Sequence, residues 1–228
     1  MNLYFGNLMT VPTSDNQLCS VTLLGNLVNK PEIRYTVNPI IPVTEITLAT
    51  HTKWLDKTTK KYKEWTSYHQ IKVIGPLVEQ TLLHVKKGDL VLINGYLSDN
   101  ANKLNKVTSN IITASFIQTF AKGYSQSINQ IHCSGTLSSV VKLLTTENNK
   151  ELAQVEVTLS HHAYSIAKQK IQQNIITTKV HVWGKQAVVL SEKAQLGDHI
   201  VIEGKLNYST SVDKSQYIEG KNIHLFKN

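Results

Sequence analysis

The sequence predicts an all-β protein made of two tandem five-stranded barrels, each with one short helix. Three observations lead to this fold class. The chain of 228 residues repeats itself once, at a spacing of about 110 residues. Each copy alternates apolar and polar residues over segments of strand length, and each copy contains one short helix-like run. We expect domains at 1–122 and 129–228, because the polar stretch AKGYSQSIN at 121–129 is typical of a linker.

Five matched positions define the repeat, because they keep both their order and their spacing. The spacing is far longer than that of a solenoid repeat, so we interpret it as an old tandem duplication of a whole domain. The matched pairs are Gly25 and Gly135, Leu48 and Leu159, Gly75 and Gly184, Gly88 and Gly197, and Gly95 and Gly204.

Each copy contains the same predicted elements in the same order. A long first strand is broken by a glycine that permits a bend, and two alternating strands follow. A helix that ends at a glycine comes next, and two further strands complete the copy. Five strands with a helix between the third and the fourth are the plan of the OB-fold, a partly open Greek-key barrel. The predicted strands are 18–28, 43–50, 66–74, a segment up to Gly95 and 107–117, then 130–143, 152–159, 176–183, a segment up to Gly204 and 217–226, and the helices are 76–87 and 185–196.

Composition and charge limit the classes of function. The chain carries 24 Lys and Arg residues against 16 Asp and Glu residues, a net charge of +8, and its pI is about 9.3. This excess favours an anionic partner such as nucleic acid or acidic lipid, although a modest excess also serves solubility alone. No apolar run is long enough to span a membrane, and the N-terminal segment lacks the pattern of a secretory signal. We expect an intracellular protein without membrane contact.

The sequence contains no pattern typical of a metal centre or an active site. Cys19 and Cys133 each begin an apolar run, so we expect reduced, half-buried strand residues, with a disulfide or a metal as the alternative. The adjacent pair His161 and His162 lacks further ligating partners. Phosphate-binding loops, zinc-protease motifs, nucleophile elbows and paired carboxylates are all absent from the sequence. We therefore expect no cofactor, no metal and no catalysis.

Two strands have an outer face suited to single-stranded nucleic acid. In TKVHVWG, alternation places Lys179, His181 and Trp183 on the face opposite to the two valines. In YHQIKVIG, it places Tyr68, Gln70, Lys72 and Ile74 outward and His69 inward. Lysine attracts phosphate and aromatic rings stack on bases, which together allow binding without sequence preference.

The first copy resembles bacterial single-stranded DNA-binding proteins (SSBs) over almost its whole length. The resemblance rests on LLGNLVNKPEIRYT (23–36), LATHTKW (48–54), EWTSYHQIKVIG (64–75) and KKGDLVLINGYL (86–97). The second copy retains SGTL, VHVWGKQA and LGDHIVIEGKL and resembles the family more weakly. Two such domains in one chain are similar to the tandem form of some bacterial SSBs, in which two chains pair to supply four OB-folds. The resemblance thus implies a homodimer and a cytoplasmic, nucleoid-associated protein encoded by a bacterium or a mobile element.

The resemblance also implies which aromatic residues stack on bases. Trp54 and Tyr68 match two stacking positions of the family, and a third is occupied by Ile74 in the first copy and by Trp183 in the second. A fourth stacking position falls in SDNANKLNK, which contains no aromatic residue. For Trp183, stacking is favoured over a place in the core because the valines already occupy the inner face. For Trp54 it is favoured because the residue ends a strand just before the basic loop LDKTTKKYK.

Residues around the predicted loop LDKTTKKYK have two interpretations. Tyr62 and Trp65 either brace the hairpin or contact nucleic acid. The lysine run is either a solvated loop or an arm that contacts the phosphates along a single nucleic-acid strand. We include all of these residues among the candidates. The candidates for phosphate contact are Arg34, Lys57, Lys60, Lys61, Lys63, Lys72, Lys179 and Lys185.

Further expectations come from the resemblance alone. Arg34 lies in the PEIRYT segment, where a structural role in a turn is the alternative to phosphate contact. His69 matches a histidine at the subunit contact of the family, so we expect it at an interface. The chain stops at IHLFKN, without the Gly/Pro/Gln-rich linker and acidic tip of the family. We expect that docking route to be absent and cannot name other protein partners.

The sequence therefore predicts a protein that binds single-stranded DNA with little sequence preference and protects it during replication, recombination or repair. The alternative with the same fold is an accessory protein of the primosomal or mobile-element type that acts mainly through protein contacts. RNA binding is a third interpretation, which discrimination of the ribose would test.

Overall fold

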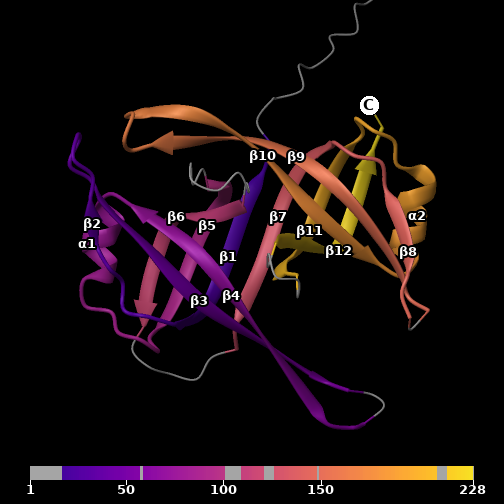
Figure 1. The fold of residues 1–228 in the computed structure, drawn as a ribbon, viewed down its shortest axis with the longest axis horizontal. Helices are drawn as coiled ribbons and strands as arrows, with labels where there is room; N and C mark the ends of the chain where they lie inside the picture. The colour runs from indigo at the N-terminus through magenta and orange to yellow at the C-terminus, as the bar shows by residue number, and fades with distance from the viewer. Residues whose placement is uncertain are drawn as a thin grey trace, which may run out of the picture.

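The computed structural model consists of two five-stranded barrels, each with one helix, joined by a shared sheet (Figure 1). It describes residues 17–56, 59–100, 109–120, 126–147, 149–209 and 215–227, with the backbone alone at Asn100 and Ser109. The first barrel comprises β1 (Cys19–Leu27), β2 (Arg34–Tyr35), β3 (Pro42–Leu55), β4 (Tyr62–Ile74), α1 (Pro76–Leu82), β5 (Leu90–Asn100) and β6 (Ser109–Phe120). The second comprises β7 (Ile128–Leu137), β8 (Lys142–Thr145), β9 (Glu151–Ser165), β10 (Lys170–Trp183), α2 (Lys185–Lys193), β11 (His199–Tyr208) and β12 (Gln216–Phe226).

Strand pairing closes each barrel in the way that the OB-fold requires. The sheet order is β2-β3-β4-β6-β5-β1-β7-β11-β12-β10-β9-β8, and the additional pairs β1–β3 and β7–β9 close the two barrels. The pairs β4–β6 and β10–β12 are parallel. Each helix lies between the third and fourth long strands of its barrel, so the predicted all-β fold with two tandem OB domains is confirmed.

Four details of the sequence-based prediction are wrong. The predicted strand 130–143 is two strands, β7 and β8, separated by a break after Leu137. The second and third strands of each domain are longer than predicted, because they pair beyond the barrel as a two-stranded hairpin. The helices end at Leu82 and Lys193, earlier than expected.

The structural counterpart of Leu48 is Val157, because β1–β3 pairs Leu27 with Leu48 whereas β7–β9 pairs Leu137 with Val157. The sequence match with Leu159 was a slip of two residues, which preserves the inward face and so leaves the apolar pattern unchanged.

The repeated glycine of the first strand is required where the barrel closes. At Gly25 a Cβ atom would lie 2.3 Å from the backbone oxygen of Ala49 in β3. At the matched Gly135 it would lie 2.7 Å from the oxygen of Thr158 in β9. No larger residue fits such a close approach of two backbones without a shift of the strands. The same steric constraint thus explains the same glycine in both copies.

The two barrels are joined edge to edge by the antiparallel pairing of β1 with β7. Val21 pairs with Ile131, its own counterpart in the repeat, so an approximate twofold axis passes through this pair. Both side chains are fully buried, in a cluster that contains core residues of both barrels. Cys19 lies opposite Cys133 in the same ladder, and both are free thiols. Cys133 is fully buried, not half-buried as the sequence suggested.

Each long hairpin extends from its own barrel across the other domain. Figure 1 shows the β3–β4 hairpin passing below the second domain and the β9–β10 hairpin passing over the first. The joint at β1–β7 therefore places the hairpin of one domain beside the barrel face of the other. Contacts between the domains thus reach well beyond the shared sheet.

Two buried histidines contact tyrosines of the opposite domain. His69 Nε2 lies 2.9 Å from Thr50 Oγ1, and its Nδ1 lies 3.4 Å from the hydroxyl of Tyr208 in the second domain. On the other side of the axis, the ring of His161 meets that of Tyr96 edge to face, with centroids 5.1 Å apart. His69, expected at a contact between subunits, is fully buried at the contact between two domains of one chain. Whether a second chain adds to this contact stays a prediction.

The burial of His69 predicts a loss of stability in acid. Burial lowers the pKa of His69 from 6.5 to about 4, which favours the neutral ring in the folded protein. Between these two values the unfolded chain binds a proton that the folded chain does not. The free energy of unfolding should therefore fall by up to about 3 kcal/mol as the pH decreases through this window.

Urea denaturation of the protein and of its His69→Gln variant between pH 7 and pH 4 measures this contribution. We expect a shallower pH dependence in the variant, since it lacks the group that titrates. Identical pH profiles for the two proteins would show that His69 is not held neutral by the fold.

Candidate nucleic-acid interface

The β3–β4 hairpin has two different faces. Opposite residues of an antiparallel pair lie on the same face, and Thr52 is opposite Trp65 while Trp54 is opposite Lys63. Trp54 and Trp65 therefore share one face of the hairpin. They are the continuation of the inward face of the barrel, because they alternate in phase with the buried Thr50, Ser67 and His69. Beyond the barrel this face turns toward the second domain.

The tyrosines of the same hairpin lie on its opposite face. Tyr62 and Tyr68 alternate in phase with each other and out of phase with Trp65. Tyr68 is exposed and continues the outer face of the first barrel. Lys53 Nζ lies 5.2 Å from the centre of the Tyr62 ring, within reach of a cation–π contact. The structure thus brings Trp54 and Trp65 together but separates both from Tyr62 and Tyr68.

Strand β10 provides the outer face of the second barrel. Val180 and Val182 are buried, whereas Lys179 and Trp183 are exposed and His181 is half-buried, so the predicted faces are confirmed. The same holds for β4, where His69 is inside and Tyr68 is outside. Trp183 is the last residue of β10 and lies opposite Leu152 of β9.

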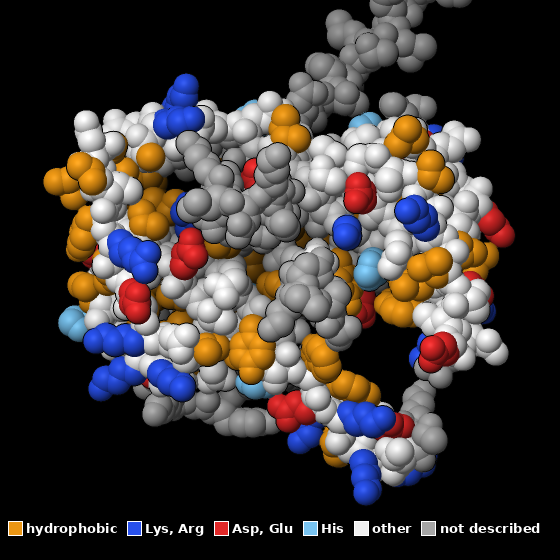
Figure 2. All heavy atoms as spheres, viewed as in Figure 1, with side chains coloured by type: hydrophobic (Ala, Val, Ile, Leu, Met, Phe, Trp, Pro, Cys, Tyr) orange, Lys and Arg blue, Asp and Glu red, His pale blue; other side chains and the backbone are white. Residues whose placement is uncertain are grey.

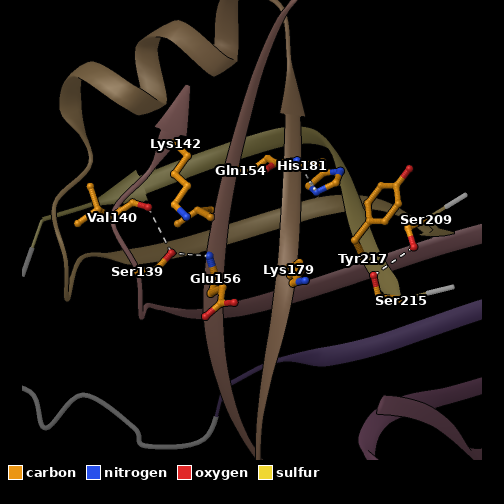
Figure 3. A pocket seen from close by; sticks show the side chains of 11 residues that line it. Ser139, Val140, Lys142, Gln154, Glu156, Lys179, His181, Ser209, Ser215 and Tyr217 are labelled. Carbon is orange, nitrogen blue, oxygen red and sulfur yellow. Dashed lines mark hydrogen bonds between the residues drawn. The ribbon is translucent and has the colours of Figure 1, made fainter. Parts of the chain in front are cut away.

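A stacked pair of rings occupies the middle of this face, and sequence reasoning missed it. The rings of His181 and Tyr217 lie 4.1 Å apart between centroids at an angle of 29°. Gln154 Nε2 lies 3.3 Å from His181 Nε2, within hydrogen-bonding distance of the imidazole edge (Figure 3). Burial and then Lys179 lower the pKa of His181, opposed by Glu219, so the ring is neutral near pH 7. Because Ile218 is buried, alternation along β12 places its neighbour Tyr217 on the outer face. No local sequence pattern shows that β12 pairs with β10, which is what brings Tyr217 beside His181.

A groove of about 490 Å³ runs beside the stacked pair over the second domain (Figure 3). Its lining comes from the β7–β8 connection, β8, β9, β10, β12 and the described ends of the β11–β12 connection. Lys142 and Lys179 contribute positive charge, Glu156 contributes negative charge, and Ser139 and Ser209 contribute hydroxyls. The groove therefore combines cations, hydrogen-bonding groups and aromatic rings.

A second groove, of about 690 Å³, separates the β3–β4 hairpin from the second domain. Trp54 and Trp65 line the hairpin side, and His181, Tyr217 and Lys205 line the opposite side. Figure 2 shows a hollow above the hairpin, with lysine side chains near the hairpin tip and hydrophobic side chains at the border of the hollow. His181, Ser209 and Tyr217 line both grooves, so the two adjoin at the stacked pair.

The predicted basic residues differ in exposure and in whether an acidic side chain pairs with them. Lys63 pairs with Asp56 across the hairpin, and Arg34 lies 3.4 Å from Glu32 at a highly exposed site. The exposed pair of Arg34 is weak, so a phosphate can displace it. The Asp56 side chain is largely covered, so the charge of Lys63 is less free. Lys60, Lys61, Lys179 and Lys185 are exposed, and Lys72 is half-buried on the outer face of β4. Lys57 lies outside the described residues, as does most of the SDNANKLNK stretch.

Two absences concern only the part of the chain that the structure describes. Within it, no group of three His, Cys, Asp or Glu side chains is arranged to hold a metal ion. Nor does it include a helix long and apolar enough to cross a membrane.

Comparison with known families and structures identifies the two domains. A sequence model described as "Single-strand binding protein family" matches residues 18–119 and 128–222. The chain belongs to the single-strand binding protein family. The SSB family consists of DNA-binding proteins without enzymatic activity, and this chain carries two of its domains in tandem.

The fold is similar to that of an SSB with two domains. The wild-type single-stranded DNA binding protein from Thermus aquaticus matches with a TM-score of 0.77 and 19% identity, over 93% of this chain and 95% of that chain. A deletion mutant of the same protein matches with a TM-score of 0.77 and 20% identity, over 92% and 95% of the two chains. At this identity the similarity establishes the fold of both domains and their tandem order.

The geometry of the tryptophans predicts a spectroscopic result. Trp54, Trp65 and Trp183 are 44%, 52% and 42% exposed, so each indole contacts solvent in the free protein. We expect acrylamide to quench the fluorescence of all three, measured in variants that retain one tryptophan and replace the others with phenylalanine. A blue-shifted emission that resists quenching in any one variant would mean that this tryptophan is a core residue.

Proposed function

We propose that this SSB-family protein binds single-stranded DNA with little sequence preference and protects it during replication, recombination or repair. One observation carries the proposal: all three tryptophans of the chain are exposed on strands that also bear lysines. Exposed tryptophans are costly for a protein without a partner, since a large apolar ring then faces water. The membership of both domains in the family supports the same conclusion.

The mechanism combines stacking with electrostatic attraction. Each base stacked on an aromatic ring contributes roughly 1–3 kcal/mol, and any base can stack because every base has a flat face. Lysine contacts to phosphate release counterions, so they make the affinity fall with salt without reading sequence. We therefore assign the affinity mainly to stacking on Trp54, Tyr68 and Trp183. We assign the salt dependence mainly to the lysines, among which Lys72 and Lys179 lie on the barrel faces.

The proposal includes pairing of two chains, as the family resemblance implies. A dimer would contain four OB domains and could wrap a longer strand than one chain. Native mass spectrometry with and without a long oligo-dT gives the number of chains and the binding of DNA in one measurement. A monomer in both states would remove the dimer from the proposal and leave single-strand binding untouched.

The difference between Trp183 and Ile74 gives a matched test of stacking. The two residues occupy the same position in the two domains, at the end of β10 and of β4. Trp183→Ala should weaken binding of oligo-dT by about tenfold, as expected for loss of one stacked base, whereas Ile74→Ala should change it by less than about twofold. Fluorescence titration at several salt concentrations measures both effects.

Three outcomes would contradict the proposal. Equal effects of the two substitutions would show that the outer face of β10 is not a stacking surface. Binding that does not depend on salt would exclude the phosphate contacts. A wild-type protein that does not bind oligo-dT, or that binds an RNA of the same sequence more tightly, would favour the accessory or the RNA-binding role.

A further inference from the structure

We propose that the groove between the β3–β4 hairpin and the second domain is a base-binding site built from both domains. In it, Trp54 and Trp65 form one wall and the stacked pair of His181 and Tyr217 forms the other. The occupants are nucleobases of the single strand, so the inference rests on the proposed function and assigns a specific place to it. It adds Tyr217 and His181 to the binding residues.

The chemistry of the groove fits flat aromatic rings that carry a phosphate chain. Its volume of about 690 Å³ is within the range of ligand sites, and both walls are aromatic. Lys205 lines the groove at its second-domain side, 3.2 Å from Glu219, and Lys63 stands beside Trp54 on the hairpin. Neutral rings and flanking cations are the two components that sequence-tolerant strand binding uses.

The groove also adjoins the groove over the second domain. The stacked pair lines both this groove and the groove over the second domain, where Lys142 and Lys179 lie. A strand held between the hairpin tryptophans and Tyr217 would therefore continue along β10 toward Trp183. This path passes from one domain to the other within a single chain.

The approximate twofold axis of the chain provides an internal comparison. On the other side of the axis, a pocket of about 500 Å³ lies between the β9–β10 hairpin and the first domain. By the register of the hairpins, Ala163 and Asn174 occupy the places of Trp54 and Trp65. Lys72 occupies the place of His181, and the buried Ile111 occupies the place of Tyr217. None of the four aromatic side chains has an aromatic counterpart, although the backbone arrangement is the same.

The tip of the second hairpin packs on the first barrel at Gly75. A Cβ atom at Gly75 would lie 2.6 Å from Cδ1 of Ile166 at the tip of this hairpin. The residue that matches Ile166 in the first hairpin is Lys57, which lies outside the described residues, so this contact is compared no further. Aromatic residues also line the pocket beside the second hairpin, namely Tyr96 and Tyr164, but they do not stand at the places of the four groove residues. We infer that the chain binds bases unequally on its two sides.

A double-mutant cycle with oligo-dT tests the composite site. Trp65→Ala and Tyr217→Ala should each weaken binding by roughly 5- to 150-fold, the loss of one stacked base. The double variant should lose clearly less than the product of the two single effects, because both residues hold the same base or adjacent bases. Asn174→Ala is the matched control for Trp65 and should change the affinity by less than about twofold.

Two further measurements separate loss of the ring from loss of the fold. Tyr217→Phe retains the ring and should retain most of the affinity, and thermal unfolding of each variant reports its stability. Photocross-linking to an oligonucleotide that contains 5-iodouracil should label Trp54 or Trp65 and Tyr217 in the unmodified protein, as identified by mass spectrometry.

The outcomes distinguish this inference from the proposed function. If Trp183→Ala weakens binding while Trp65→Ala and Tyr217→Ala do not, the protein binds single strands but the groove between the domains is not the site. Single effects that multiply in the double variant would place the two residues at separate sites and overturn the composite groove. Failure of the wild-type protein to bind oligo-dT would overturn both proposals.

Discussion

The antiparallel pairing of β1 with β7 is the constraint on which the rest of the structure depends. It joins the barrels into one sheet. It also sets the orientation of one barrel to the other, which are related by the approximate twofold axis at Val21 and Ile131. Because the barrels have this orientation, each hairpin crosses the other domain, and His69 reaches Tyr208. The groove between Trp65 and Tyr217 exists only because this pairing sets one domain beside the hairpin of the other. Fold and candidate site therefore share one structural cause.

Patterns along one strand could be predicted from the sequence, whereas relations between strands could not. Period-two alternation correctly placed Val180 and Val182 inside and Lys179 and Trp183 outside, because burial of one sheet face selects residues locally. The sequence indicated a special position at Gly25 but suggested a bend there, whereas the structure shows a close backbone contact that excludes every larger residue. The contact between His181 and Tyr217 depends on a parallel pairing of β10 with β12, whose register no local pattern encodes.

The length of the hairpins is a second feature that the sequence did not predict. The stretch from Leu55 to Tyr62 is polar and lysine-rich, so it suggested a loop closer to the barrel. In the structure the strands on both sides pair to their ends at Leu55 and Tyr62, and pairing of the backbone holds them together although neither face is buried in a core. Alternation within this extension separates the aromatic residues that the sequence had grouped. Trp54 and Trp65 face the second domain, whereas Tyr62 faces away.

A contact between two identical chains must be self-complementary, because every substitution occurs on both sides of the axis at once. In this chain the corresponding contact lies within one polypeptide, so each side of the axis can change independently. The contact between His69 and Tyr208 has no equivalent across the axis, because the matching positions are Thr178 and Asp99. The hairpins differ as well, since Trp54 and Trp65 of one match Ala163 and Asn174 of the other. Covalent fusion of the two halves thus allows the two sides of the axis to carry different residues, which a symmetric pair of identical chains could not do.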